Sequence, residues 1–237
     1  MNKLCKYADD KTLISPSNND ISFEDEFIHI LQWSKDNKHR LNFSKTQEIV
    51  FNRPGPGSRM LNLPPPLENI ERVDSVKLLG CVLTDGLTGA KHVDFILNIV
   101  NQRLYLLNYF KAHGMNIHGL TLVFDAIVVS RIMYAMQAVS FLVNQADIVR
   151  INAVFKKAHR WGLTTKLLRF ENLATQADAK LFRALKNKDH CLHQLLPDKR
   201  TNYSLNLRKR GHDYCLPELQ TELHKSSFIN RCLFKFV

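Results

Sequence analysis

A segment rich in proline and glycine, Arg53 to Pro66, divides this chain into two parts that must fold differently. It contains two Pro-Gly pairs and a triple proline. Because proline fixes its own φ and has no backbone N–H, such a segment cannot continue a helix or a central strand. We therefore expect an exposed connector here.

Before the connector, the sequence predicts one hairpin, one helix and one further strand. Leu4 to Ile14 alternates residue types on both sides of an Ala-Asp-Asp centre, which is the pattern of a tight β-hairpin with an acidic tip. An amphipathic helix is predicted from Ser22 to Lys38, with Ser22 as its cap and Asp25 in its first turn. Lys45 to Phe51 is predicted to be another strand.

After the connector, the first elements are again predicted to be strands. Leu67 to Arg72 and Ser75 to Leu83 have the alternation of a second hairpin, which we expect to turn near Val73 and Asp74. This pair ends the strand-rich part of the chain.

From Lys91 onward, the apolar residues have helical spacing. One helix is predicted to end at Gly114, and a second, nearly all-apolar helix to run from about Ile117 to Val143. A third begins at Asn144, a good capping residue, and the three would form a bundle. Phe170 to Lys188 is predicted to be one more helix, whereas Leu196 to Val237 is basic and weakly patterned.

The composition favours a globular chain with a negatively charged partner. Hydrophobic residues make up 45% of the 237 residues, with only 9 Gly and 8 Pro, so disorder is not the expected state. Thirty-three Lys and Arg against 22 Asp and Glu leave a formal charge of +11. That charge favours nucleic acid or an anionic membrane surface as a partner.

Several features predict an intracellular protein of the nucleus or cytoplasm, without a signal peptide or a transmembrane segment. The five cysteines are odd in number and show no close pairing motif, and no apolar signal segment opens the chain. The apolar stretch from Leu120 to Val143 contains Asp125 and Arg131, each of which would cost about 2.5–3.5 kcal/mol at mid-bilayer. We expect this stretch to be a buried helix and expect no membrane partner.

The C-terminal third is rich in histidine and cysteine, which are the ligands that zinc prefers. No pair of cysteines has Cys-x-x-Cys spacing, so no zinc site is expected. The residues concerned are His190, Cys191, His193, His212, Cys215, His224 and Cys232.

The sharpest chemical feature is the tetrapeptide Tyr7-Ala8-Asp9-Asp10. Adjacent carboxylates on a rigid hairpin tip can hold a divalent metal where phosphoryl transfer needs charge to be neutralised. A solvated turn is the other interpretation of an Asp-Asp pair.

The segments that follow the tetrapeptide keep a characteristic order. They are Trp33 with Asn37, then Leu41-Asn42-Phe43-Ser44-Lys45-Thr46, Val76-Lys77-Leu78-Leu79-Gly80-Cys81-Val82-Leu83, Arg103-Leu104-Tyr105-Leu106-Leu107, Tyr134-Ala135 and Phe155-Lys156-Lys157-Ala158-His159-Arg160. In this order they resemble the reverse transcriptases of non-LTR (LINE-type) retrotransposons, over roughly residues 4 to 165. Ser227 to Leu233 is similar to the end of these elements.

The resemblance implies an α+β chain in three parts. Residues 1–89 would be a partial palm, made of a catalytic hairpin, a hairpin like the primer grip and one helix. Residues 90–168 would be an α-helical thumb bundle, and residues 169–237 a helical or irregular basic tail.

The resemblance also implies RNA-directed DNA synthesis with Mg²⁺, or Mn²⁺ in its place, on an RNA template and a DNA primer. Asp9 would be the metal-binding catalytic carboxylate and Asp10 its acidic partner. Lys45 would lie near the phosphates of the incoming nucleotide, unless it is merely a solvated lysine. The residues near the primer end would be Tyr7, Leu79 and Gly80.

Basic residues of the thumb would bind nucleic acid. Lys156, Lys157 and Arg160 lie within about one and a half helical turns, and Trp161 could stack on a base. Arg103 would belong to the same surface by resemblance. A solvated helix face is the alternative interpretation of the cluster.

Complete enzymes of this family take a further metal-binding aspartate from an upstream strand, and here only six residues precede Tyr7. Since two-metal catalysis needs ligands on both sides of the ions, we expect little or no polymerase activity from this chain alone. We also expect an unpaired edge on the catalytic hairpin. An upstream polymerase half could complete the site in trans. The alternatives are a non-catalytic nucleic-acid-binding remnant and a protein-interaction remnant.

Overall fold

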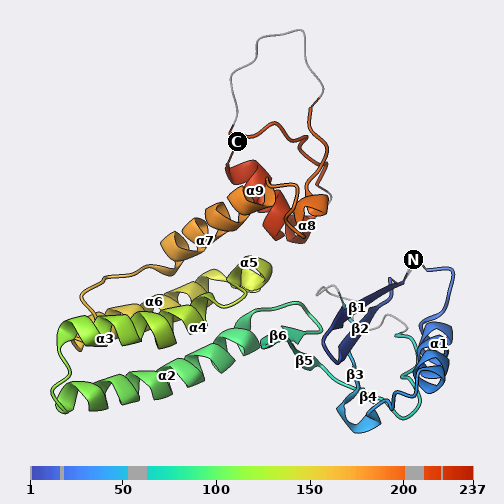
Figure 1. Ribbon diagram of the computed structural model, residues 1–237, viewed down its shortest axis with the longest axis horizontal. Coiled ribbons are helices and arrows are strands. Elements are labelled where there is room, and N and C mark those ends of the chain that lie inside the picture. The colour runs from blue at the N-terminus through green and yellow to red at the C-terminus, as the bar shows by residue number, and fades with distance from the viewer. Residues whose placement is uncertain (1, 17–18, 53–62, 201–210, 220, 237) are drawn as a thin grey trace. The chain divides into compact units, whose positions relative to one another are not determined.

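The computed structural model describes residues 2–16, 19–52, 63–200, 211–219 and 221–236 (Figure 1). It is a mixed α+β structure, with short paired strands early in the chain and mostly helices later, as predicted. The chain divides into two compact units, Met1–Val76 and Lys77–Val237. The connector predicted for Arg53 to Pro66 lies outside the described residues except for 63–66, which form no helix or strand.

In its described residues, unit 1 contains one hairpin, one α-helix, one 3₁₀ helix and one short parallel pair. Its elements are β1 (Lys3–Tyr7), β2 (Asp10–Ile14), α1 (Phe23–Asp36), a 3₁₀ helix (Phe43–Lys45), β3 (Gln47–Glu48) and β4 (Glu71–Arg72). β1 and β2 pair antiparallel with Tyr7 opposite Asp10, which confirms the predicted hairpin. The strand predicted for Lys45 to Phe51 is reduced to two residues, because Lys45 belongs to the preceding 3₁₀ helix.

Helix α1 begins and ends with regular capping geometry. The Ser22 side chain accepts a hydrogen bond from the Asp25 N–H, which confirms the predicted cap. At the other end, the Lys38 N–H donates to Lys35 O (3.1 Å) and the His39 N–H to Ser34 O (2.8 Å), the two bonds of a Schellman motif. Lys38 takes the left-handed position of this motif, with φ of +57°, where glycine is the usual residue.

The second hairpin is formed by other residues than those predicted from alternation. β4 pairs in parallel with β3, with Glu48 opposite Arg72, and not with the segment after Asp74. The Arg72 guanidinium also forms an ion pair with the buried Glu48 carboxylate (2.8 Å). The hairpin itself consists of β5 (Ser75–Leu78) and β6 (Cys81–Thr84) and turns at Leu79 and Gly80. The prediction of a turn near Val73 and Asp74 was therefore wrong, and the hairpin lies in the segment Val76 to Leu83.

Unit 2 continues from this hairpin into helices. They are α2 (Ala90–Ala112), α3 (Ile117–Phe124), a π-helical turn (Asp125–Val129), α4 (Ser130–Met133), α5 (Met136–Val139), a 3₁₀ helix (Ser140–Leu142), α6 (Gln145–Arg160), α7 (Phe170–Leu185), a 3₁₀ helix (His193–Leu195), α8 (Glu222–Ser226) and α9 (Phe228–Lys235). The predicted helices ending at Gly114 and beginning at Asn144 are confirmed, as is the one starting at Phe170.

The single helix predicted from Ile117 to Val143 is interrupted twice. A π-helical turn follows α3, and Ala135, with φ of +53°, separates α4 from α5. The buried residues explain the irregularity, since Leu120, Phe124, Val128, Ile132 and Met136 follow one another at intervals of four. A spacing of four advances about 40° past a full α-helical turn. The wider π turn, which takes up an extra residue, reduces this drift and keeps the five side chains on the core.

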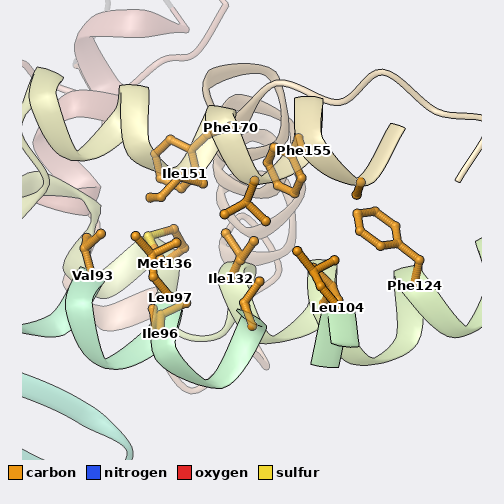
Figure 2. Packing of buried hydrophobic residues seen from close by; sticks show 14 of the residues in the cluster. Val93, Ile96, Leu97, Leu104, Phe124, Ile132, Met136, Ile151, Phe155 and Phe170 are labelled. Atoms are coloured by element: carbon orange, nitrogen blue, oxygen red, sulfur yellow. The ribbon is translucent and has the colours of Figure 1, made fainter. Parts of the chain in front are cut away.

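The main core of unit 2 lies between α2, the α3–α5 segment, α6 and the start of α7. Figure 2 shows Ile151, Phe155 and Phe170 facing Ile132 and Met136. From α2, the core receives Val93, Ile96, Leu97, Val100, Leu104 and Leu107. The Ile117–Leu142 segment is long and apolar enough to cross a membrane by length and composition, a test that the core helix of a globular domain also meets.

A smaller apolar cluster joins the C-terminal residues to α7. Phe182, Tyr214, Cys232 and Leu233 form its buried centre. His212 is buried beside them, with Nε2 2.7 Å from the Leu233 carbonyl oxygen and Nδ1 accepting from the Tyr214 N–H. The weakly patterned C-terminal region therefore contains a built core in the part that the structure describes.

Candidate functional site

The hairpin β1–β2 presents two carboxylates at its tip. Ala8 and Asp9 form the two-residue turn, and Ala8 has φ of +52°, the left-handed conformation that such tight turns require. Asp10 is the first residue of β2 and lies opposite Tyr7, whose side chain is 67% exposed. Asp9 and Asp10 are also exposed. Both carboxylates are thus accessible to an ion in solvent.

Two adjacent carboxylates can supply part of a magnesium site and cannot complete one alone. A two-metal centre needs oxygen ligands on both sides of the ions. Within the described ranges, no three His, Cys, Asp or Glu side chains come together in a way that could hold a metal ion. Further oxygen ligands beside Asp9 and Asp10 could come from the phosphate of a substrate or from another chain.

The Trp33 ring of α1 contacts two lysines of the β1–β2 hairpin. Lys6 and Lys11 lie opposite each other in the strand pair. Their ammonium groups lie 4.5 Å and 3.9 Å from the centre of the Trp33 ring, and His39 stacks on that ring at 5.6 Å. Such cation–π contacts are worth about 0.5–1 kcal/mol each at exposed sites. They orient the acidic tip relative to α1, a role for Trp33 that the sequence interpretation missed.

Lys45 is exposed at the end of the 3₁₀ helix Phe43–Lys45. Its backbone N–H donates to Asn42 O (3.1 Å), so the backbone position is fixed while the side chain is free to reach solvent. Lys45 belongs to unit 1 with Asp9 and Asp10, whereas Leu79, Gly80, Arg103 and the α6 lysines belong to unit 2.

The Tyr134 side chain ties the β5–β6 turn to the helices of unit 2. Leu79 and Gly80 both have positive φ, +46° and +83°, as a two-residue hairpin turn demands. The Tyr134 hydroxyl donates to the Leu79 carbonyl oxygen (2.9 Å), and a Cβ on Gly80 would lie 3.3 Å from the Tyr134 ring. Tyr134 therefore positions this turn. The residue occurs in the quoted motifs, but sequence reasoning assigned it no such contact.

A buried polar cluster lies under the same hairpin. The Val82 N–H donates to His92 Nδ1 (3.2 Å), and burial, then the nearby Arg131 charge, lowers the pKa of His92. Burial raises the pKa of the Cys81 thiol, and Arg131 partly offsets this. Among the described residues, His92 Nε2 and Arg131 Nε are buried without a hydrogen-bond partner. The Arg131 guanidinium also lies 5.1 Å from the centre of the Phe95 ring.

Arg103 makes a contact within the fold. It is half-buried, and its Nη1 donates to the carbonyl oxygen of Ile127 in the π-helical turn. A π-helical turn leaves backbone groups without their usual α-helical partners, and the guanidinium supplies one. The positive charge of Arg103 therefore has a structural role in the fold.

The basic cluster on α6 combines exposure with an aromatic neighbour. Lys156 and Arg160 are exposed, and the Lys157 ammonium lies 4.4 Å from the centre of the Trp161 ring. Lys111, from the end of α2, donates to the Trp161 carbonyl oxygen. Cations at a helix C-terminus also offset its dipole, so the cluster has a structural use as well as a binding one.

No protein-family model, curated protein or solved structure matches this chain. The resemblance to reverse transcriptases therefore rests on the order of its sequence motifs.

Three of the four histidines considered as zinc ligands, His190, His193 and His212, make hydrogen bonds through their rings. His193 Nδ1 lies 2.7 Å from the Leu185 carbonyl oxygen, and His190 Nδ1 accepts from the Leu192 N–H. Cys232 is fully buried, and burial, with the Asp178 charge next, raises the pKa of its thiol to about 12. These contacts stabilise the fold and leave the thiol of Cys232 protonated.

Proposed function

We propose that this chain is a reverse-transcriptase-derived fragment of the non-LTR type that binds an RNA template paired with a DNA primer. The observation that carries the proposal is the tight hairpin whose two-residue turn brings Asp9 and Asp10 to an exposed tip. An exposed carboxylate pair on a rigid turn suits Mg²⁺ or Mn²⁺ bound together with substrate phosphates. The formal charge of +11 supports a polyanionic partner.

In this proposal, residues 1–89 act as a partial palm and the helices of residues 90–168 as a thumb. The turn at Leu79 and Gly80 would approach the primer end, since Tyr134 fixes its backbone. Lys156 and Arg160 would contact phosphates, and Trp161 supports Lys157 beside them. Arg103 would act indirectly, through the π-helical turn.

The chain alone would not polymerise. The described residues bring only two carboxylates together at the tip, and phosphoryl transfer through two metals needs a more complete ligand set. A separate polypeptide that supplies a further metal-binding aspartate could add to the exposed hairpin and complete the centre.

The test is binding of the purified chain to a labelled RNA–DNA primer-template across a salt series, with nucleotide incorporation measured in the same tubes under Mg²⁺. We expect binding that weakens steeply with salt and no incorporation. Adding an upstream polymerase half is expected to give extension that Asp9→Ala abolishes and Asp20→Ala, a matched charge change at another exposed position of unit 1, preserves. A folded chain that fails to bind would overturn the proposal.

A further inference from the structure

Unit 1 contains an open groove that neither the acidic tip nor α6 lines. It has a volume of about 720 Å³ and lies between the end of α1 and the 3₁₀ helix Phe43–Lys45. Ligand pockets commonly measure about 300–1,000 Å³, so the groove can hold a nucleotide unit. Its functional side chains are those of Lys35, His39, Arg40, Asn42 and Phe43.

The basic side chains that line the groove face no acidic side chain within that lining. Lys35 and Arg40 line it together with His39, and no carboxylate lies among the described residues of its lining. Lys38 and Asp36, adjacent in the chain but outside the lining, are both exposed. Such a cluster of cations attracts an anion that carries several charges at short intervals, as a phosphodiester backbone does.

An aromatic side chain lies among these cations. Phe43 is 43% exposed and lines the groove with the aliphatic side chains of Leu31 and Leu41. A flat apolar ring beside phosphate-binding cations is the arrangement with which proteins stack unpaired bases. In a duplex the base faces are covered by their neighbours, so this combination fits a single strand.

Hydrogen bonds fix the walls of the groove in advance. The buried Ser34 hydroxyl donates to His39 O (2.8 Å), and the Ser44 hydroxyl donates to Asn42 Oδ1 (2.7 Å). The Thr46 hydroxyl donates to Asn42 O (2.9 Å). Because both walls are tied to the helix ends, little ordering is needed when a strand binds.

We propose that this groove binds single-stranded nucleic acid, with phosphates at Lys35 and Arg40 and one unpaired base against Phe43. No residue of the tip or of α6 lines the groove, so this proposal does not depend on the proposed primer-template binding.

The test uses the full chain and a 12-nucleotide oligouridine that carries one photoreactive 4-thiouridine. The double variant Lys35→Gln/Arg40→Gln should bind roughly 10- to 30-fold more weakly at about 0.1 M salt, and its log–log salt slope should fall by about 1.4, that is, about 0.7 per lost phosphate contact. Phe43→Leu should weaken binding roughly tenfold and remove the cross-link to the groove peptide. Lys180→Gln/Lys188→Gln removes two exposed lysines of unit 2 and should change neither result beyond about twofold.

Several outcomes would overturn the inference. One is wild-type affinity in a folded Lys35→Gln/Arg40→Gln variant, and another is cross-linking that maps only outside residues 31–44. Equal competition by poly-glutamate would show that the groove accepts any polyanion. Lys156→Gln/Arg160→Gln should weaken primer-template binding and leave the oligouridine cross-link at Phe43 intact, so the two proposals fail separately.

Discussion

Arg231 and Asp178 form a two-point ion pair, in which Nε and Nη2 each lie 2.8 Å from a carboxylate oxygen. The same guanidinium donates to the carbonyl oxygens of Gln137 (2.8 Å) and Ser226 (3.0 Å). One side chain of α9 thus connects α7, α5 and the end of α8. The side chain of Asp178 is only 8% exposed and that of Arg231 18%.

Removing one partner of this pair should destabilise unit 2 strongly. Arg231→Met leaves the Asp178 carboxylate buried without a counter-ion, which costs about 3–5 kcal/mol for buried pairs. The loss is measured as a change in the free energy of unfolding by urea denaturation. Lys225→Met is the control, since Lys225 and Glu222 are 3.9 Å apart and exposed, and it should change the free energy by less than about 1 kcal/mol. A similar effect of both variants would contradict the prediction.

Replacing Gly89 or Gly114 by alanine should destabilise the chain, for a different reason at each position. A Cβ on Gly89 would lie 2.5 Å from the Leu142 carbonyl oxygen, which is backbone and cannot rotate away. Gly114 has φ of +87° and no atom within 4 Å of such a Cβ. We expect Gly114→Ala to cost about 1 kcal/mol from backbone strain, and Gly89→Ala to cost more, about 2–3 kcal/mol, from overpacking. Thermal unfolding of both variants tests the order, and the reverse order would refute it.

Lys38→Gly should stabilise the chain by about 1 kcal/mol. Lys38 has φ of +57° in the Schellman motif after α1, a conformation that glycine adopts without steric cost. The exposed side chain contributes little packing that would be lost. Chemical denaturation followed by tryptophan fluorescence in a Trp161→Phe background would report on unit 1 through Trp33, with Lys38→Ala as the control that keeps the strain. No gain in Lys38→Gly would mean that the lysine makes a compensating contact.

The stability of unit 2 should fall as pH falls below about 6.5. Burial and the Arg131 charge lower the pKa of His92 in the folded state from its ordinary 6.5, and Cys81 is the other titratable group of that cluster. The unfolded chain therefore takes up the proton more readily, so the contribution is complete above the ordinary pKa and is lost as pH falls toward the folded-state pKa. His92→Asn keeps an acceptor for the Val82 N–H without titrating. Its unfolding free energy should depend less on pH between 7.5 and 5.5 than that of the wild type, and equal dependence would exclude His92.

Thiol labelling should separate the five cysteines into two groups. Cys5, Cys191 and Cys215 are exposed, whereas Cys81 and Cys232 are buried. Because burial raises the pKa of the Cys232 thiol to about 12 and also raises that of Cys81, neither forms the reactive thiolate near neutral pH. Maleimide followed by peptide mass spectrometry should modify the first three in the native chain and all five in urea. Native labelling of Cys232 would show that the C-terminal cluster opens.

The sequence predicted correctly those structural features that depend on residues close together in the chain. Ser22 and Asn144 cap the helices that were predicted to follow them, and the Ala-Asp-Asp centre forms the predicted tip. The pairing of β3 with β4 was not predictable in this way, because it joins residues 24 positions apart across the connector. Alternation around Val73 and Asp74 suggested a turn, but the paired positive φ values of Leu79 and Gly80 decided where the chain reverses.

The candidate site was predictable in its residue types and less so in its contacts. Asp9, Asp10 and the α6 lysines were identified as exposed charges, and they are exposed or half-buried. Arg103, which the resemblance assigns to nucleic-acid binding, is half-buried and donates to the Ile127 carbonyl oxygen, a contact that was not predicted because the segment that contains Ile127 was interpreted as one continuous helix. The signal for the π-helical turn in the sequence was the spacing of four residues between successive apolar residues from Leu120 to Met136.

That π-helical turn has a consequence for how this segment tolerates change in length. Deleting one residue between Asp125 and Val129 would allow a regular α-helix in place of the π-helical turn. Phe124 and Ile132 would then be seven α-helical steps apart, about 700°, so Ile132 would still face the core. A regular α-helix that kept all the residues would instead turn Ile132 about 80° away from the side on which Phe124 lies, so the π-helical turn offsets one extra residue in this segment.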